Sequence, residues 1–367
     1  MESLLLLCLL LTPLGVVASP ALTIQSPDGD LIDCTPIQEQ PAFSNPLLKD
    51  HQLQETPTDM VRREEGYRLP IWQIWHRNGT ACLEGTIPVR RIISYQNETT
   101  SSNGADRATQ GHEYAVGLMK SQPKIYGTRA TMNVWRPTIE GSDEFSLGQI
   151  WLTSGSYNTS DLNSIEAGWQ VDAYNNTGCY NLRCGGFVQT SRNVVVEGAI
   201  DQISTFGGSQ ADMTLKMWKD EKIGVWWLGI LLEHGVHEPV GYWPQILFTG
   251  LRDHGERVQW GGEITNKQPY GRHTRTEMGS GYFPDSGFGN AAYMRNLEVA
   301  FSENDFQPLQ ELYVGGTHLD YYQARKSHNH ELGTHFYYGG PRQLAIAVRV
   351  TWDWSLLYIC FSFFLLI

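Results

Sequence analysis

Apolar and polar residues alternate with a period of two in several short stretches of the chain. Met213, Leu215 and Met217 would lie on one face of an extended segment, and the more polar residues between them on the other. Residues 130–135 show the same alternation, which ends at Arg136 and Pro137. A period of two is typical of β-strands that bury one face, so both stretches predict strands.

Two denser apolar runs, 194–196 and 224–232, suit strands that are buried on both faces. Glycine pairs separate such runs at 185–186, 207–208, 261–262, 315–316 and 339–340. Only 18% of the residues are charged, 11% are aromatic and 37 are glycine, which favours many short strands and turns over long amphipathic helices. We therefore expect an all-β fold, an antiparallel β-sandwich of two stacked sheets.

A polar stretch divides the chain. Residues 94–110 (SYQNETTSSNGADRATQ) are rich in Ser, Thr and Asn and nearly free of large apolar residues, as expected of an exposed linker. It separates a front segment, residues 22–93, from a body, residues 111–343. An exposed linker is also where a processing protease would cut.

The N-terminal residues 1–21 resemble a signal peptide. Residues 4–11 form an apolar core, and small residues around 18–21 would allow cleavage, although Glu2 stands where a positive charge is usual. We expect a secreted protein of the extracellular space or cell wall, with vacuolar routing as an alternative. Acceptor sequences for N-glycosylation begin at Asn78, Asn97, Asn158 and Asn175.

The last segment, residues 344–367, is strongly apolar and ends in LLYICFSFFLLI. That run has 12 residues, whereas a membrane-spanning helix needs about 20. Extending it backwards would include Asp353 and Arg349. Two interpretations stay open: a membrane role, or a divergent tail that never packs against the fold.

The charge balance excludes one class of partner. The chain has 27 Lys and Arg against 39 Asp and Glu, a net charge of −12, and its basic residues form no run longer than a pair. Such a surface would not neutralise a phosphate backbone, so we expect no nucleic-acid partner.

The cysteines fit an oxidising compartment. If Cys8 leaves with the signal peptide, five cysteines stay, and we expect the pairs Cys34–Cys82 and Cys179–Cys184, with Cys360 left over. By the chain-entropy account, the first disulfide closes a long loop and would stabilise the fold by roughly 3–5 kcal/mol.

Several hydrolase motifs are absent. The His234/His237 and His328/His330 pairs lack the HExxH order that places two zinc ligands one helical turn apart, so we expect no metal and no cofactor. No G-x-S-x-G motif occurs. One Asp-Ser-Gly turn at 285–287 does not suffice for an aspartic peptidase, which needs two.

Two carboxylates stand out by their surroundings. Glu166 lies in SIEAGW, where its apolar neighbours would occupy the opposite strand face. Glu263 follows two glycines in WGGEI. Both could line a cleft with Trp169 and Trp260 at its rim, or each could be one of 39 acidic residues solvated at a strand edge.

Longer motifs carry a resemblance to the neprosin family of plants. In the body they are SIEAGWQV at 164–171, TGCYNLRCGGFVQ at 177–189, WKD and WWLG within 218–229, GYWP at 241–244, WGGEI at 260–264, and MGSGYFP with GFG within 278–289. In the front segment they are IDC at 32–34, QPAFSNPLLKDH at 40–51 and CLEGTIPVRR at 82–91. The resemblance covers about residues 30–341 in the family's order.

The resemblance implies a glutamic peptidase on a β-sandwich, with catalytic glutamates at Glu166 and Glu263. It implies cleavage of proline-containing peptides after proline at acidic pH, once residues 22–93, an inhibitory activation peptide or pro-domain, are lost. Two nearby carboxyl groups can divide the roles of base and acid if one keeps its proton. Substrate-binding candidates, by proximity to the motifs, are Trp169, Trp260, Tyr242 and Trp243.

The chain departs from the family's pattern in two places. About fifteen residues usual after Val171 are missing, and so is a C-terminal cysteine together with its partner. Two other functions stay open: a secreted carbohydrate- or cell-wall-binding protein with an exposed tryptophan platform, and a glycosidase, which also uses paired carboxylates.

Overall fold

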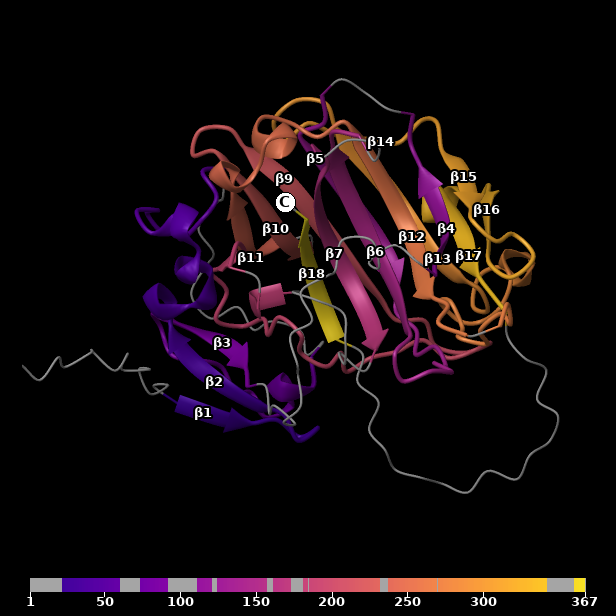
Figure 1. Ribbon diagram of the computed structural model, residues 1–367, viewed down its shortest axis with the longest axis horizontal. Helices are drawn as coiled ribbons and strands as arrows, with labels where there is room; N and C mark the ends of the chain where they lie inside the picture. The colour runs from indigo at the N-terminus through magenta and orange to yellow at the C-terminus, as the bar shows by residue number, and fades with distance from the viewer. Residues whose placement is uncertain are drawn as a thin grey trace, which may run out of the picture.

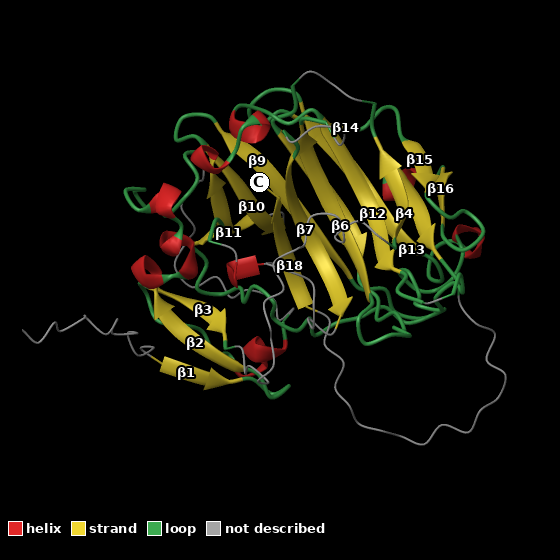
Figure 2. Cartoon of the chain, viewed as in Figure 1, coloured by secondary structure: helices red, strands yellow, loops and turns green. Residues whose placement is uncertain are grey.

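The computed structural model describes residues 22–59, 73–91, 111–120, 124–156, 161–172, 181–183, 185–231, 237–268, 270–341 and 360–366. Within them the chain is almost entirely antiparallel β-structure joined by loops and short 3-10 turns, as Figure 2 shows. The predicted all-β sandwich is confirmed. No helix among the described residues is long and apolar enough to span a membrane.

The described strands form three sheets. The front segment holds a three-stranded sheet of β1 (Leu22–Gln25), β2 (Leu31–Pro36) and β3 (Thr86–Arg90). A six-stranded sheet has the order β15 (Tyr313–Gly316), β4 (His112–Leu118), β12 (Arg257–Thr265), β6 (Phe145–Ser154), β7 (Asn163–Asp172) and β18 (Cys360–Leu366).

The nine-stranded sheet is the other layer of the sandwich. Its order is β16 (Gln323–Ser327), β17 (His335–Gly339), β13 (Ala292–Ala300), β5 (Gly127–Asn133), β9 (Asp212–Asp220), β10 (Val225–Leu231), β11 (His237–Pro244) and β8 (Val188–Gln189), with β14 (Phe306–Pro308) paired to β13. Figure 1 shows the six-stranded sheet crossing in front of it.

Short 3-10 turns connect the strands. They are η1 (Ile37–Glu39), η2 (Pro41–Ser44), η3 (Pro46–Leu48), η4 (Ile74–Asn78), η5 (Asn181–Arg183), η7 (Gln245–Leu247), η8 (Gly250–Arg252), η9 (Pro284–Ser286) and η10 (His330–Leu332). The first four belong to the front segment and lie beside the sandwich in Figure 1.

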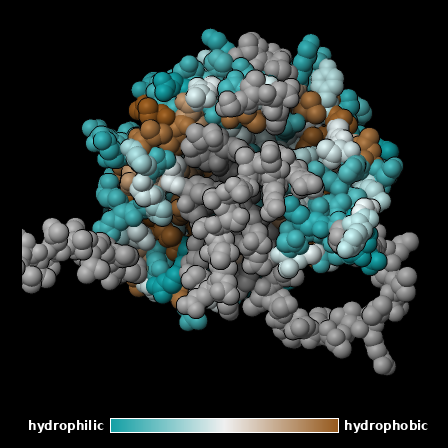
Figure 3. Space-filling view, viewed as in Figure 1, coloured by the Kyte–Doolittle hydropathy of each residue, from teal (hydrophilic) through white to brown (hydrophobic). Residues whose placement is uncertain are grey.

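The core lies between the two large sheets. Gly117, Gly148 and Gly262 of the six-stranded sheet face β17, where an added Cβ would clash with Phe336 or Tyr338. Those glycines let the two layers approach closely, because there is no side chain to hold them apart. In Figure 3, hydrophobic residues surface only in separate patches among hydrophilic ones.

The two alternating stretches form the predicted strands. Met213, Leu215 and Met217 lie in β9 with their side chains buried, and residues 127–133 form β5 beside it. The run 224–232 contains β10. The strand predicted at 194–196 is wrong: these valines are buried in a loop, where Val195 packs in a cluster with the front segment and Val196 forms one bridge to Val89.

The end of the hydrophobic tail packs against the fold, so the interpretation of a tail that never packs is wrong. Residues 360–366 form β18, which pairs antiparallel with residues 164–170 of β7, with Phe364 opposite Glu166. A run of apolar, β-favouring residues suits a strand added to a sheet edge. Residues 1–21, 60–72, 92–110 and 342–359, including the predicted signal peptide and linker, lie outside the described residues.

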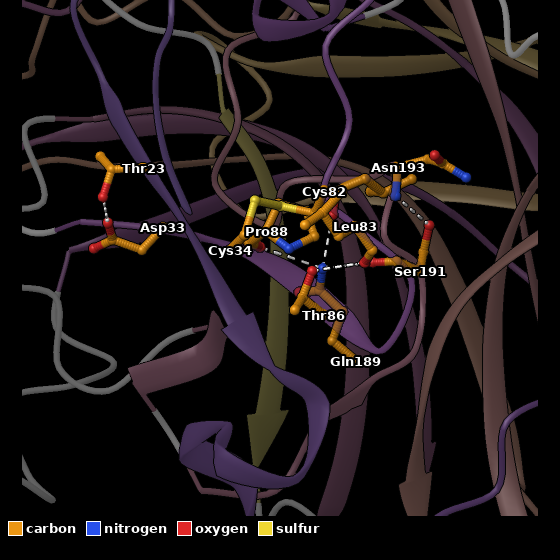
Figure 4. Close-up of a disulfide and its surroundings, with 11 residues drawn as sticks. Thr23, Asp33, Cys34, Cys82, Leu83, Thr86, Pro88, Gln189, Ser191 and Asn193 are labelled. Carbon is orange, nitrogen blue, oxygen red and sulfur yellow. Dashed lines mark hydrogen bonds between the residues drawn. A yellow bond between two sulfur atoms is a disulfide. The ribbon is translucent and has the colours of Figure 1, made fainter. Parts of the chain in front are cut away.

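The front segment is fixed by a disulfide between Cys34 of β2 and Cys82, with Cα atoms 5.5 Å apart. Figure 4 shows this bond beside Gln189 and Ser191 of the body. The pair predicted from the sequence is confirmed. Cys179 and Cys184 lie outside the described residues, as do the glycosylation candidates Asn97, Asn158 and Asn175 and the side chain of Asn78.

Candidate active site

The two predicted catalytic glutamates lie on the same face of the six-stranded sheet. Glu166 of β7 is paired with Trp151 of β6, and Glu263 of β12 is paired with Leu147 of β6. Directly paired residues in an antiparallel sheet point to the same side. The two partners, Trp151 and Leu147, are four residues apart in β6, so they also point to the same side. Both carboxyl groups therefore lie on the outer face, away from the nine-stranded sheet.

Gln149 of β6 stands between the two glutamates on this face. It is paired with Gly168 of β7 and Gly261 of β12, so each glutamate is its diagonal neighbour, at a separation of about 7–8 Å between Cα atoms. Its two glycine partners leave room for the amide: a Cβ at Gly168 would lie 2.5 Å from that of Gln149. The face thus carries a row of carboxyl, amide and carboxyl groups.

Glu166 is a buried acid. The Gln149 amide donates to Oε2 at 2.8 Å, and the Ser164 hydroxyl donates to Oε1 at 2.7 Å. Burial raises the pKa of Glu166 to about 8; the charge of Glu263 raises it too, while the two hydrogen bonds lower it. In mildly acidic solution this carboxyl group therefore holds its proton, because removal from water disfavours the charged form more than two donors can offset.

Glu263 has a different environment. Its Oε1 contacts Nδ1 of His112, the first residue of the neighbouring strand β4. The imidazole ring of His112 packs edge-on against Phe145, with centroids 5.5 Å apart. Glu263 thus has a basic side chain beside it, whereas the partners of Glu166 are a neutral amide and a hydroxyl group. The site therefore contains two carboxyl groups with different hydrogen-bond partners.

Aromatic residues flank both carboxyl groups. Trp151 is directly opposite Glu166, and Tyr114 of β4 is directly opposite Glu263. The two rings meet edge to face with centroids 6.3 Å apart, across the position of Gly261, which has no side chain to separate them. They belong to an apolar cluster that also contains Val116, Leu118, Phe145 and Leu147.

The four aromatic residues predicted to bind substrate lie elsewhere. Trp169 and Trp260 are three positions from the glutamates, so alternation turns them to the inner face, where both are fully buried. The Trp169 indole donates to the Asn133 carbonyl at 2.9 Å, across the core. The expected cleft rimmed by these two tryptophans is therefore wrong.

Tyr242 and Trp243 belong to β11 of the nine-stranded sheet. Trp243 is paired with Trp226 and buried, and its ring packs against Phe187 at 4.7 Å. Tyr242 points to the outer face of that sheet, where its hydroxyl accepts from the Gln54 amide at 2.9 Å. Neither residue shares a surface with the glutamates.

The described part of the front segment covers the side of the nine-stranded sheet. The Gln40 side chain accepts from the Gln189 amide at 2.7 Å, Thr58 donates to Asp220 at 2.9 Å, and Gln73 donates to the Val195 carbonyl at 2.7 Å. An inhibitory activation peptide is expected to lie across the groove of the glutamates. Its described residues instead lie beside β11, as Figure 1 shows, and contact β8 through the hydrogen bond between Gln40 and Gln189.

The neighbours of the two glutamates that the sequence analysis did not name are Gln149, Trp151, Tyr114 and His112. A signal for the first two exists: Phe145, Leu147, Gln149 and Trp151 alternate with the inward residues of one strand. Tyr114 and His112 belong to β4, which lies beside Glu263 because it pairs with β12. A sequence motif does not show which strands pair. Of the histidine pairs considered for zinc, His234 lies outside the described residues.

The described site thus defines a class: a carboxyl-dependent acid–base centre on an antiparallel β-sandwich. A sequence model of the family described as Neprosin matches residues 142–341, more than half of the chain, and the chain belongs to this family. A second, described as Neprosin activation peptide, matches residues 23–118, which extends through the predicted linker to the end of β4. These matches support a peptidase made with an activation peptide.

Two solved structures are similar to the chain at a low level. Scytalido-glutamic peptidase with a peptide-based transition-state analog has a TM-score of 0.32 and 10% identity, covering 62% of this chain and 98% of that one. SCP-B, a member of the Eqolisin family of peptidases in a complex with the tripeptide Ala-Ile-His, has a TM-score of 0.30 and 9% identity over the same shares. Our assignment rests on the geometry and the family matches.

Proposed function

We propose that this protein is a secreted glutamic endopeptidase, made as a zymogen, that cleaves peptide bonds after proline in acid. The observation that carries the proposal is the row Glu166, Gln149 and Glu263 on one sheet face, with one carboxyl group held neutral and the other beside a histidine. That asymmetry is what a two-carboxyl mechanism needs.

The roles follow from the two environments. Ionised Glu263 takes a proton from a water molecule as the water oxygen attacks the peptide carbonyl carbon. Neutral Glu166 donates its proton toward the carbonyl oxygen, on which negative charge develops. When the C–N bond breaks, the proton on Glu263 passes to the leaving nitrogen, and Glu166 recovers its own from the hydroxyl group that becomes the new carboxyl group.

Gln149 holds Glu166 in position for this step. Its amide nitrogen donates to Glu166, and its Oε1 is buried without a protein partner among the described residues. A buried acceptor of this kind suits a bound water or the N–H of a substrate. We assign to Gln149 the positioning of Glu166 and of the attacking water.

The preference for proline is supported by the aromatic pair. Tyr114 and Trp151 lie opposite the two glutamates and offer flat apolar surfaces of the kind that a pyrrolidine ring packs against. The carbohydrate-binding alternative would need an exposed tryptophan platform, and the exposed large apolar residues of the described segments include no tryptophan. Secretion is supported by the N-terminal sequence and by the Cys34–Cys82 disulfide.

The test is cleavage of paired peptides by acidified precursor, followed by mass spectrometry. We expect cleavage after proline and at least tenfold slower cleavage when that proline is replaced by alanine. Glu166→Gln and Glu263→Gln should each lower the rate by about 10³-fold or more, roughly 4 kcal/mol in the barrier. Glu331→Gln, an exposed carboxyl group, is the control. Unchanged turnover in either active-site variant would rule out the two-carboxyl mechanism.

A further inference from the structure

A second cluster of ionisable side chains lies on the opposite face of β4 from the active site. It contains Glu113, His273 and His318, whose candidate ligand atoms lie within 4.8 Å of one another. His273 follows β12 and His318 follows β15, so three segments distant in the sequence meet here. Glu113 is next to His112 in the chain, and alternation sends the two side chains to opposite faces.

The hydrogen bond at Nδ1 of His273 leaves a lone pair on its other ring nitrogen, Nε2, which faces the Glu113 carboxylate. Its Nδ1 lies 2.7 Å from the carbonyl oxygen of Thr274, which can only accept, so Nδ1 carries the proton. Its Nε2 lies 2.8 Å from Oε2 of Glu113. In the neutral ring, Nε2 and the carboxylate oxygen would face each other as two acceptors, an arrangement that needs either a proton or a metal ion between them.

The surroundings fix these groups as metal ligands are usually fixed. A metal-binding histidine commonly donates its other nitrogen to a backbone carbonyl, as His273 does to Thr274. Its ring also stacks on Tyr321, with centroids 3.4 Å apart and planes 2° apart. The amide of Asn266 donates to Oε1 of Glu113 at 3.1 Å, which orients the carboxylate.

The local charge favours a cation. The Glu113 side chain is only 3% exposed, and Nδ1 of His318 lies 2.9 Å from its Oε1. The negative charges of Glu113, Glu144 and Glu140 raise the pKa of the nearby Tyr322 hydroxyl, after the larger effect of burial. A buried carboxylate is costly unless a positive charge accompanies it.

We propose that Glu113, His273 and His318 bind a divalent metal ion of the zinc class. Two imidazole nitrogens and one carboxylate suit zinc better than calcium or magnesium, which prefer oxygen ligands. The nitrogen-to-oxygen separations of 2.8 and 2.9 Å would widen by roughly 0.5 Å to place the ligands about 2.0–2.2 Å from one tetrahedral ion, a change that small side-chain rotations can supply. The side chain of His318 is 59% exposed, which leaves a fourth position to water.

The sequence led us to expect no metal site. The three proposed ligands share no local motif, so motif reading could not find them. An ion here would fix the start of β4, the strand that enters the body, to the loops after β12 and β15. It would thereby hold His112 against Glu263 on the other face. Its role is structural, since none of its ligands lies on the face of the two catalytic candidates.

The test is zinc binding by the full-length precursor, dialysed against a chelator and kept near neutral pH, because protons compete with zinc for histidine nitrogens. Calorimetric titration with zinc chloride should show one site per chain, and zinc should raise the melting temperature. His318→Ala, at an exposed position, should bind at least tenfold more weakly, and His273→Ala should bind more weakly still.

His328→Ala, an exposed histidine outside the cluster, is the matched control and should bind as the unmodified precursor does. Circular dichroism of each variant establishes that it is folded. The proposal is overturned if the precursor binds no zinc, or if His318→Ala and His273→Ala bind as tightly as the control. In that outcome a proton alone lies between His273 and Glu113.

Discussion

The two faces of the six-stranded sheet are built from the same strands and have opposite characters. The inner face carries Trp169 and Trp260, both fully buried, and glycines that let Phe336 and Tyr338 approach. The outer face carries Glu166 and Glu263 together with a buried amide. Stability comes mainly from the first face, and the proposed chemistry from the second.

The comparison shows how one alternating strand serves both purposes. In β7, Ile165, Ala167 and Trp169 turn inward, while Ser164 and Glu166 turn outward. A well-packed inner face fixes the backbone, so the outer side chains are held in position without needing a core of their own. Changes on the inner face should therefore affect folding, and changes on the outer face should affect activity and pH dependence.

The largest effect on stability is expected from Trp169→Ala. It leaves a cavity between the sheets and an unpaired Asn133 carbonyl, and it should lower the free energy of unfolding by about 3–5 kcal/mol. Urea denaturation measures it. Trp151→Ala on the outer face is the matched variant and should cost less stability while impairing cleavage. Equal losses of stability would contradict the contrast between the faces.

The next effect is the pH dependence of stability. Because the pKa of Glu166 is raised to about 8, the folded chain binds this proton more tightly than the unfolded chain does. That contribution is fully present below the usual glutamate pKa and is lost as the pH rises to about 8. It amounts to a few kcal/mol, since one pKa unit corresponds to about 1.4 kcal/mol.

Glu166→Gln should remove this dependence, so that its stability relative to the unmodified precursor rises between mildly acidic and alkaline pH. Denaturation midpoints across that range measure it, with Glu331→Gln as the exposed control. If the two variants follow the same pH curve, the carboxyl group of Glu166 is not buried in the way described.

A smaller effect is expected from Gln149→Leu. Losing the amide donor should slow cleavage by about 10–100-fold, roughly 1.4–2.8 kcal/mol. The hydrogen bond favours the ionised form of Glu166 and so lowers its pKa. Its loss should therefore raise the pKa of Glu166 and move the alkaline limb of the pH–rate profile to higher pH. A slower enzyme with an unmoved limb would mean that Gln149 acts only through packing.

The smallest effect is expected from Tyr242→Phe at the contact with the front segment. The hydroxyl group accepts from the Gln54 amide and lies 2.9 Å from the His51 ring, so its loss should weaken the contact by about 1 kcal/mol. The front segment should then be removed a few times faster in acid, as followed by gel electrophoresis. Tyr313→Phe, an exposed tyrosine, should process at the rate of the unmodified chain.

Much of the fold could be predicted because alternation is a local property. The strands around Met213 and Ala130 and the buried run that contains β10 follow directly from it. The expected Cys34–Cys82 disulfide is also present, although cysteine positions alone allow other pairings. The valines at 194–196 misled because burial against the front segment resembles burial in a strand.

The site was only partly predictable for a related reason. Proximity along the chain suggested Trp169 and Trp260, whereas a spacing of three in a strand turns them away from the glutamates. The residues that do flank the glutamates come through sheet pairing, from β4 and β6. Strand order and register are set by long-range contacts, which one sequence does not reveal.

The central claim is that burial keeps the proton on Glu166, on the same sheet face as Glu263. It is tested most directly by carbon-13 NMR titration of the glutamate carboxyl groups in labelled precursor and in Glu166→Gln. The account predicts one carboxyl signal that titrates near pH 8, far above the others, and that is missing from the variant. If every glutamate titrates in the ordinary acidic range, or if the high signal survives in Glu166→Gln, the account is contradicted.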